Sequence, residues 1–245
     1  MSSFPHRLWK ALSQRWQEES TRSNPVSASA NIVRELGSFV RDSTPERRRT
    51  RYGDMEYDWE HRVNTTSGGI GWRERLLGTF HSPYQPTDAA LFRDMMTSLP
   101  IDFNQFTFVD LGSGKGRTLL MASEYPFRRI VGVEILPELH QEAQKNIQAY
   151  KSPTQLCTQT ESICADAREF VLPEEPLVLY LFNPLPEAAL RLVIGNLKQS
   201  TSPLWIVYHN PLLERVLAES GWLEREGGTE GYVVYRLLRR FPTSG

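Results

Sequence analysis

A glycine-rich turn after a short apolar run is the feature that most limits what this chain can fold into. Residues 106–111 form the apolar run, and residues 112–116 read GSGKG. The segment at 117–123 then has the pattern of a helix. A strand, a glycine turn and a helix form a unit that binds nucleotides or anions, because glycine lets the backbone approach a ligand and the amides at the helix start point outward.

The spacing of the glycines excludes two common versions of this unit. The dinucleotide fingerprint Gly-x-Gly-x-x-Gly requires glycine at the position that Arg117 occupies. The phosphate loop Gly-x-x-x-x-Gly-Lys-Ser/Thr requires glycine in place of Val109 and a hydroxyl residue in place of Gly116. We therefore expect a ligand that is neither a dinucleotide nor a nucleoside triphosphate.

Strand and helix patterns alternate from residue 88 onward. The run at 177–182 is nearly all apolar, as in a central parallel strand that is buried on both faces. The last two strands flank GGTEG at 227–231, which indicates an antiparallel hairpin. The pattern predicts an α/β fold with a doubly wound, mostly parallel seven-stranded sheet and a C-terminal antiparallel hairpin. The expected strands are 106–111, 129–134, 162–165, 177–182, 204–208, 222–226 and 232–238. The expected helices are 88–99, 117–123, a helix opened by Pro137 with Leu139, Ala143 and Ile147 on its core face, 188–197 and 211–219.

Acidic residues stand at the ends of two predicted strands. Asp110 precedes the glycine turn, where a carboxylate can pair with a ligand ammonium group but would repel a phosphate. Glu134 ends the second strand, 22 residues after Gly112, where a carboxylate can accept hydrogen bonds from both hydroxyls of a ribose. Asp110 could instead cap the turn, and Glu134 could be an exposed strand end.

The pattern Asp110-x-Gly112-x-Gly114-x-Gly116 resembles motif I of class I S-adenosylmethionine-dependent methyltransferases. YQPT at 84–87 and GVE at 132–134 add a resemblance to small bacterial members of that family and to class I protein-lysine methyltransferases. The resemblance covers about residues 80–210 and is specific in its cofactor half. It implies the Rossmann-like methyltransferase fold with S-adenosyl-L-methionine as cofactor.

The resemblance also implies how the cofactor would be held. Asp110 would orient its amino-acid part, directly or through water, and Glu134 would bind its ribose. Ile135 would touch adenine. Asp166 would meet the adenine amino group, or would cap a helix instead. Tyr84 and Thr87 lie in the segment that would close over the methionine end. The predicted cofactor-binding residues are Asp110, Gly112, Ser113, Gly114, Gly116, Glu134, Ile135, Asp166, Tyr84 and Thr87.

Two candidate catalytic residues follow the fourth and fifth strands. Asn183 opens NPLP, which resembles the Asp/Asn-Pro-Pro-Tyr/Phe motif of enzymes that methylate planar nitrogens. Leu185 and Pro186 depart from that motif, so its aromatic residue is missing. We expect Asn183 to hold the acceptor nitrogen, or to be only a turn residue. His209 is a candidate general base because its ordinary pKa lies near neutrality, or it has a structural role.

These residues predict methyl transfer to a nitrogen nucleophile, with a protein lysine side chain as the leading acceptor. A small-molecule acceptor and a cofactor-binding interaction module without turnover are the alternatives. A net charge of −1 and the missing aromatic at Pro186 argue against a nucleic-acid substrate.

The region before the regular pattern differs from the rest in composition. We expect a helical, partly flexible extension at 1–60, a cofactor-covering segment at 61–87 and the methyltransferase domain at 88–245. Phe4, Leu8, Leu12 and Trp16 predict an amphipathic helix that packs on the domain or contacts a partner or a membrane surface. The basic run RRRTR at 47–51 is either solvated or contacts a nucleic acid or an acidic partner.

Composition sets further expectations about metals and location. The two cysteines, Cys157 and Cys164, are expected to be ordinary thiols in a reducing compartment. No Cys/His cluster has zinc-ligand spacing, so no metal is expected. The sequence contains neither a secretion signal nor a run of about 18 apolar residues, and we therefore expect a cytoplasmic protein without a transmembrane segment.

Overall fold

The computed structural model describes residues 13, 16, 55–66, 86–183 and 185–238. The chain divides into two compact units. One comprises Met1–Trp59 and Thr66–Pro86, and the other comprises Glu60–Thr65 and Thr87–Gly245. The second unit contains the sheet and every contact of the candidate site. The domain boundaries expected at 60/61 and 87/88 stay a prediction.

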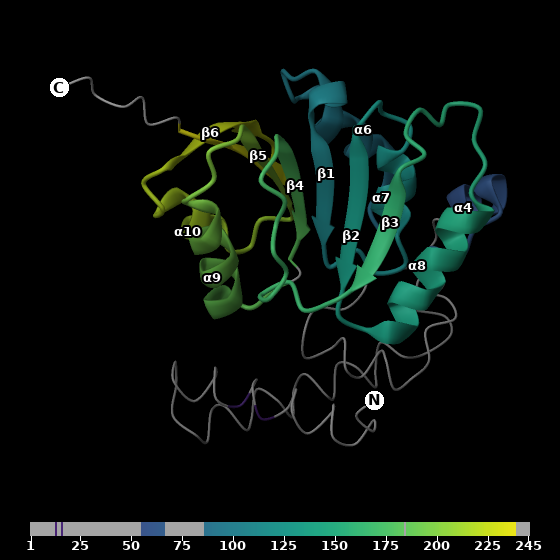
Figure 1. Ribbon diagram of the computed structural model, residues 1–245, viewed down its shortest axis with the longest axis horizontal. Coiled ribbons are helices and arrows are strands. Elements are labelled where there is room, and N and C mark those ends of the chain that lie inside the picture. Colours follow the sequence, from purple (N-terminus) through teal and green to yellow (C-terminus); the bar gives the residue numbers. More distant parts are fainter. Residues whose placement is uncertain (1–12, 14–15, 17–54, 67–85, 184, 239–245) are drawn as a thin grey trace. The chain divides into compact units, whose positions relative to one another are not determined.

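Seven strands of the described chain form one sheet in the order β3-β2-β1-β4-β5-β7-β6 (Figure 1). Strands β1 to β5 pair in parallel, whereas β7 runs antiparallel to both β5 and β6. This order confirms the predicted fold class, including the C-terminal hairpin. The strands are β1 Thr107–Leu111, β2 Arg129–Glu134, β3 Thr160–Cys164, β4 Leu177–Phe182, β5 Leu204–His209, β6 Leu223–Gly228 and β7 Tyr232–Leu237.

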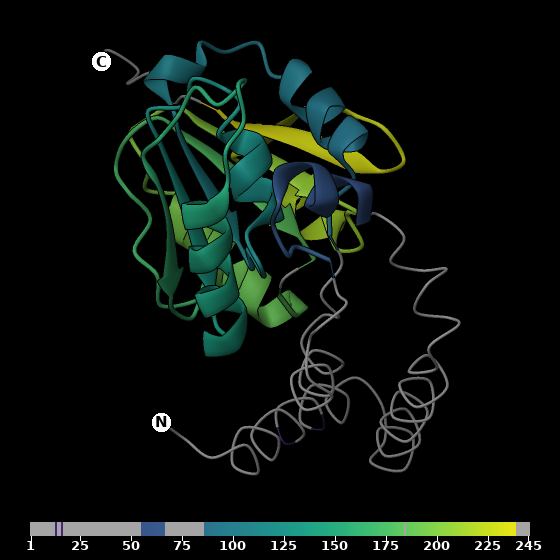
Figure 2. The same ribbon diagram turned by 90° about the vertical axis from the view of Figure 1, so that its right-hand side faces the viewer.

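Helices cover both faces of the sheet (Figures 1 and 2). The chain leaves β1 toward β2 but leaves β4 toward β5 in the opposite direction, so right-handed crossovers put the connecting helices on opposite faces. Side chains of α6 and α7 pack on one face, and those of α9 and α10 pack on the other. The helices are α4 Met55–His61, α6 Ala89–Thr97, α7 Arg117–Ala122, α8 Pro137–Ala149, α9 Glu187–Leu197 and α10 Glu214–Ala218, with a 3-10 turn at Phe103–Gln105.

Glycine is required at the turn after β1 and again in β2. The φ angles of Gly112, Gly114 and Gly116 are +87°, +54° and +83°, a region that other residues rarely adopt. A β-carbon on Gly132 would lie 2.6 Å from both Leu119 Cδ1 and Ser113 Oγ. The turn therefore needs its three glycines for their conformation, and it needs glycine at position 132 of the neighbouring strand for space.

Two sequence expectations about helices are corrected. The helix predicted at 211–219 is only Glu214–Ala218, because Asn210 has a φ of +48° and the chain turns before it enters α10. On α8, Asn146 is buried in place of the expected Ile147, which is only half-buried. Asn146 is accommodated because its amide bonds to two backbone carbonyl groups.

Several expectations concern residues that the structure describes only in part. Of the predicted N-terminal stripe, Trp16 is described; it is helical and 41% exposed. The basic run at 47–51 and Tyr84 lie outside the described residues. Cys157 and Cys164 are free cysteines, the first buried and the second exposed. Within the described ranges no helix is long and apolar enough to cross a membrane, and no group of three or more His, Cys, Asp or Glu residues could hold a metal ion.

Candidate functional site

The candidate site lies at the carboxyl edge of the four central strands. The helices change faces between β1 and β4, and open α/β sheets bind ligands in the crevice beside such a switch point. The glycine turn follows β1, Glu134 ends β2, Asn183 follows β4 and His209 ends β5. The fold therefore brings both the predicted cofactor residues and the predicted acceptor residues to one edge.

Glu134 is bound to the glycine turn itself. Its Oε2 accepts a hydrogen bond of 2.9 Å from the Gly114 amide, and its Oε1 accepts one of 2.8 Å from the Leu136 amide. Burial raises the pKa of this carboxyl group, while the backbone amides that bond to it act in the opposite direction. The two amides fix the carboxylate beside the turn, where it can meet the hydroxyls of a ribose.

Asp110 is more deeply buried, with only 2% of its surface exposed. Its Oδ2 accepts a hydrogen bond from the hydroxyl of Thr118 in α7. The pKa of Asp110 is raised to about 7, mainly by burial and also by the charge of Glu134, while the bond from Thr118 acts in the opposite direction. The site thus holds two carboxyl groups whose charge is poorly solvated, a surrounding that favours a cationic ligand.

Two residues were expected around the adenine, and the structure leaves only one of them, Ile135, with an unpaired and exposed side chain. Ile135 follows Glu134 and is 45% exposed, so its side chain is available to a planar ring. Asp166 is ion-paired with Arg168, and its Oδ1 also accepts from the Arg168 amide at 2.9 Å. It therefore caps a turn, not the helix that was considered from the sequence. Its contact with adenine stays a prediction. The predicted contact of Ser113 with the cofactor also stays a prediction; this residue is buried, and its hydroxyl has no partner among the described residues.

Asn183 is held at both ends of its side-chain amide. Its Oδ1 accepts a hydrogen bond of 2.8 Å from the hydroxyl of Tyr208, and its Nδ2 donates to the backbone oxygen of Asn210 at 2.5 Å. Asn183 and Asn210 have φ angles of +44° and +48°. Two asparagines in the left-handed region therefore end adjacent strands, and such strain is concentrated at binding and catalytic sites.

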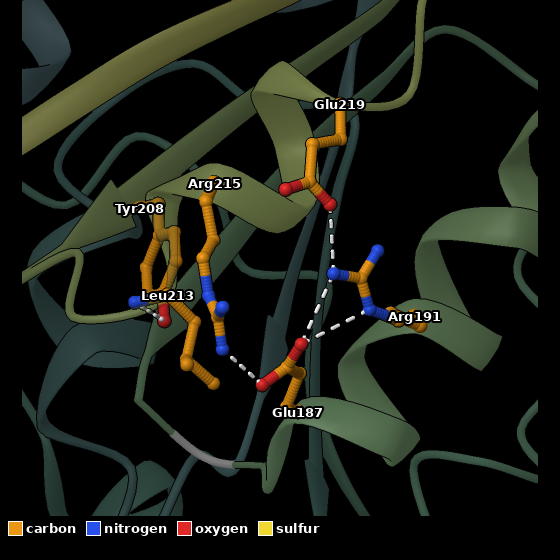
Figure 3. Close-up of polar contacts among 6 residues, drawn as sticks. All are labelled: Glu187, Arg191, Tyr208, Leu213, Arg215 and Glu219. Carbon is orange, nitrogen blue, oxygen red and sulfur yellow. Dashed lines mark hydrogen bonds and ion pairs between the residues drawn. The ribbon is translucent and has the colours of Figure 1, made fainter.

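An ion-pair network ties together the two helices that follow these strands (Figure 3). Glu187, the first residue of α9, accepts from Arg191 at 3.0 Å and also pairs with Arg215 of α10. Arg191 makes a second bond of 2.8 Å to Glu219. Exposed ion pairs contribute little to stability individually. This connected set nevertheless links the N-terminal half of α9 to both ends of α10, the two helices that follow Asn183 and Asn210 in the chain.

His209 is 8% exposed and lies on the face of the sheet opposite Tyr208. Its ring stacks on Phe182, with 3.7 Å between centroids and 26° between planes. Its Nδ1 is 2.8 Å from the hydroxyl of Tyr180. Burial lowers the pKa of His209 to about 4, and the negative charge of Asp88 only partly opposes this. His209 is therefore neutral near pH 7 and is a weaker base than its ordinary pKa suggested.

Thr87 was expected to line the methionine end of the cofactor. The residue is 2% exposed, and its hydroxyl is 2.8 Å from that of Tyr180. Its contact with the cofactor stays a prediction.

No sequence pattern indicates that residues 64 and 65 are bonded to the glycine turn and to the start of α7. The Oγ1 of Thr65 accepts from Nε of Arg117 at 2.7 Å, and the Oδ1 of Asn64 accepts from Nζ of Lys115 at 3.2 Å. Asn146 joins the two segments, because its Nδ2 donates to the backbone oxygens of Asn64 and Lys115. Lys115 and Arg117 are 3% and 2% exposed, so both cations are buried beside the turn.

Comparisons with known proteins give matches to solved structures only. No protein-family profile and no curated sequence matches the chain. An RNA methyltransferase from Salinibacter ruber with bound S-adenosyl-L-homocysteine is 23% identical over 65% of this chain and 98% of its own, with a TM-score of 0.46. A putative RNA methyltransferase from Pyrococcus horikoshii is 13% identical over 66% and 88%, with a TM-score of 0.49.

A precorrin-6y C5,15-methyltransferase from Geobacter metallireducens is also similar. It is 17% identical over 60% of this chain and 87% of its own, with a TM-score of 0.47. At these identities and scores the fold is assigned from the strand order above, and the function from the residues of this chain.

Proposed function

We propose that this chain is a class I methyltransferase that uses S-adenosyl-L-methionine. The observation that carries the proposal is the contact between Glu134 and the Gly114 amide at 2.9 Å. It places a carboxylate next to a turn of three positive-φ glycines, with a second carboxylate, Asp110, at the end of the adjacent strand. This arrangement suits a ligand with a ribose and a positive charge.

The charge of the site separates the candidate nucleotide ligands. ATP and NAD carry phosphate groups, which the carboxyl groups of Asp110 and Glu134 would repel. The two buried cations near the turn do not cancel this preference, because Lys115 and Arg117 donate to Asn64 and Thr65. S-adenosylmethionine has no phosphate, and its sulfonium and ammonium groups give it a net positive charge at neutral pH. Glu134 would then accept from the ribose hydroxyls, and Asp110 would act on the ammonium end. The exposed Ile135 would cover the adenine.

The cofactor supplies a methyl carbon that is activated by the positive sulfur. In the transfer, the lone pair of the acceptor nitrogen forms the new C–N bond. The C–S bond breaks with its electron pair going to sulfur, and the nitrogen releases a proton to water. The protein contributes mainly orientation, which supplies roughly 7–11 kcal/mol in well-aligned reactions. Asn183 is the residue we expect to aim the nitrogen, because its amide is fixed on both sides and one lone pair of Oδ1 is still available.

The proposal also includes the kind of molecule that receives the methyl group. We expect a nitrogen nucleophile, and a protein side-chain amine such as lysine remains the leading candidate. A lysine has to arrive without its proton, and the surroundings of Asn183 and His209 agree with this, since Asn183 is uncharged and His209 is neutral near pH 7. A small amine or amide is the alternative acceptor within the same chemistry.

Two measurements test the proposal in order. Calorimetry should detect micromolar binding of S-adenosylmethionine or S-adenosylhomocysteine and no comparable heat from NAD or ATP; the opposite pattern would reject the cofactor. Methyl-labelled cofactor is then incubated with cell extract and the purified chain, and the labelled product is identified by mass spectrometry. Label in protein supports the side-chain amine, and label in a small molecule supports the alternative. Label that nuclease removes would move the acceptor to nucleic acid, and binding without any transfer would indicate a non-catalytic module.

A further inference from the structure

A buried row of polar groups runs from the cofactor side of the sheet to the acceptor side. Asp110 and Tyr180 are register partners on β1 and β4. The hydroxyl of Tyr180 lies 2.8 Å from Thr87 Oγ1 and 2.8 Å from Nδ1 of His209. We propose that Tyr180 positions His209 as a neutral hydrogen-bond donor, through Nε2–H, toward the methyl acceptor. This inference rests on the proposed function for its acceptor, but not for the state of the histidine.

The direction of the two hydrogen bonds follows from the chemistry of the three groups. A neutral imidazole nitrogen accepts a hydrogen bond better than a hydroxyl oxygen does, and a phenol donates better than an aliphatic alcohol. The favoured arrangement has Thr87 donating to the Tyr180 oxygen and Tyr180 donating to Nδ1 of His209. A neutral histidine that accepts at Nδ1 carries its proton on Nε2.

The surroundings of Tyr180 keep it in the donor state. The residue is 1% exposed, and burial together with the charge of Asp110 raises its pKa well above the ordinary value. The phenol therefore keeps its proton throughout the working pH range. Stacking on Phe182 fixes the plane of the His209 ring, so both the orientation and the tautomer of the ring are set by contacts within the protein.

The other ring nitrogen is left for a ligand. Nε2 of His209 has no hydrogen-bond partner in the part of the chain that the structure describes, and the residue ends β5 at the carboxyl edge. A donor at this point can bond to an oxygen of the acceptor molecule, such as the carbonyl of an amide acceptor or a backbone carbonyl of the protein that carries the lysine. A general base at the same point would instead need Nε2 to be unprotonated.

The tautomer can be measured without any substrate. Long-range ¹H–¹⁵N spectra distinguish the two neutral forms of histidine, and the signal of His209 among the five histidines is identified by its loss in His209→Gln. We expect the Nε2–H form in the wild-type chain. In Tyr180→Phe, which removes only the hydroxyl, we expect a mixture of both forms. An Nδ1–H form in the wild type, or an unchanged spectrum in Tyr180→Phe, would overturn the inference.

Tyr235→Phe is the matched control for that spectrum. Tyr235 is also a buried strand tyrosine, 2% exposed, but its hydroxyl bonds to Glu214 at 3.0 Å and not to a histidine. The His209 signals should be unchanged in this variant. If both tyrosine variants alter them equally, the effect is a general loss of packing and the positioning role is rejected.

Turnover with the acceptor found by label transfer separates a donor from a base. His209→Gln keeps an N–H donor near the Nε2 position but cannot take up a proton, whereas His209→Ala keeps neither property. We expect His209→Gln to stay within about 10-fold of wild type and His209→Ala to lose roughly 10²-fold or more, with cofactor affinity unchanged in both. Equal losses of that larger size would identify a base and reject the donor. If no methyl transfer is found at all, the proposed function fails, while the tautomer measurement still decides whether Tyr180 positions His209.

Discussion

The hydroxyl of Tyr208 in β5 donates to Oδ1 of Asn183, at the end of β4, over 2.8 Å. The reverse relation holds on the other face of the sheet, where Tyr180 in β4 bonds to His209 at the end of β5. Each of the two strands thus carries a tyrosine that holds the polar residue at the end of its neighbour. The two residues predicted to meet the acceptor are therefore fixed from both faces of the sheet.

Replacing Asn183 should reduce turnover much more than it affects the cofactor. We expect Asn183→Gly to lower turnover by about 10²-fold, the cost of one positioned catalytic contact, with nearly unchanged cofactor affinity. Glycine is chosen because the φ of +44° would strain alanine, and Asn183→Ala should melt at a lower temperature than Asn183→Gly. Asn210→Gly is the control, since it keeps the backbone oxygen that Asn183 uses. Near-normal turnover in Asn183→Gly would reduce Asn183 to a turn residue.

Tyr208→Phe tests whether the side-chain amide of Asn183 has to be fixed by the Tyr208 hydroxyl. The variant keeps the buried ring and removes only the hydroxyl that bonds to Oδ1. We expect a fall in turnover of roughly 10-fold, smaller than for Asn183→Gly, because Nδ2 is still bonded to Asn210. In the Asn183→Gly background the same change should have little further effect, since coupled residues are not additive. Additive losses in the double variant would mean that Tyr208 acts independently of Asn183.

A side chain at Gly114 should abolish cofactor binding while the fold survives. Gly114→Val puts a β-branched residue at a φ of +54°, a strain of at least about 1–2 kcal/mol, and crowds the amide that bonds to Glu134. The thermal transition should remain cooperative at a lower temperature, with no measurable heat of cofactor binding. Gly195→Ala is the matched control, because this exposed helical glycine has open space around its β-carbon position and alanine should stabilise it by roughly 0.5–1 kcal/mol. Unimpaired binding in Gly114→Val would move the cofactor site elsewhere.

The buried carboxyl group of Asp110 predicts how stability changes with pH. Its pKa is about 7 in the folded chain and 3.8 as an ordinary side chain, so between these values the folded state holds a proton that the unfolded state releases. This contribution to stability is complete below pH 4 and is lost as the pH rises through 7. We therefore expect the free energy of unfolding of Asp110→Asn to exceed that of the ligand-free wild type at pH 8 by up to about 4 kcal/mol, and by less at pH 5, so the variant should melt at a higher temperature.

The ionisation of Asp110 should also make the affinity for the cofactor depend on pH. A cationic ligand favours the charged carboxylate, so wild-type affinity should weaken as the pH falls below 7, and binding at pH 6 should release protons. Calorimetry in buffers of different ionisation enthalpy measures that release. In Asp110→Asn the affinity should be weaker and nearly independent of pH. A pH-independent affinity in the wild type would show that Asp110 does not respond to the ligand.

Much of the fold could be predicted from periodicity, because helices and strands depend on local contacts and on apolar residues that recur at regular spacing. The predicted bounds of β2 and β4 agree with the structure, and Pro137 does begin α8. The glycine turn was recognisable since its three positive-φ residues are close in sequence. The shortened α10 was not, because the turn before it depends on the conformation of Asn210 and on a bond from Leu213 to Tyr208.

The polar contacts that complete the site could not be predicted in the same way. Thr87 and Tyr180 are 93 residues apart, and Asn64 and Asn146 are 82 apart. Neither pair has a spacing that any helix or strand period would mark. Arg117 looked like an ordinary charged residue at a helix start, and only the fold shows that Thr65 bonds to it in the interior. The lowered pKa of His209 could not be predicted for the same reason, because burial by distant segments sets it.

The two buried carboxyl groups beside the glycine turn also bear on what would follow methyl transfer in the proposed reaction. When the methyl group leaves, sulfur loses its positive charge, and a cofactor with one net positive charge becomes a zwitterionic thioether without net charge. Asp110 and Glu134 would still attract the ammonium group of that product, but the attraction of the sulfonium is lost while the ribose and adenine contacts are unchanged. The spent cofactor should therefore dissociate faster than the fresh one, and inhibition by S-adenosylhomocysteine should be relieved further at high pH, where both carboxyl groups are ionised and the preference for the cation is greatest.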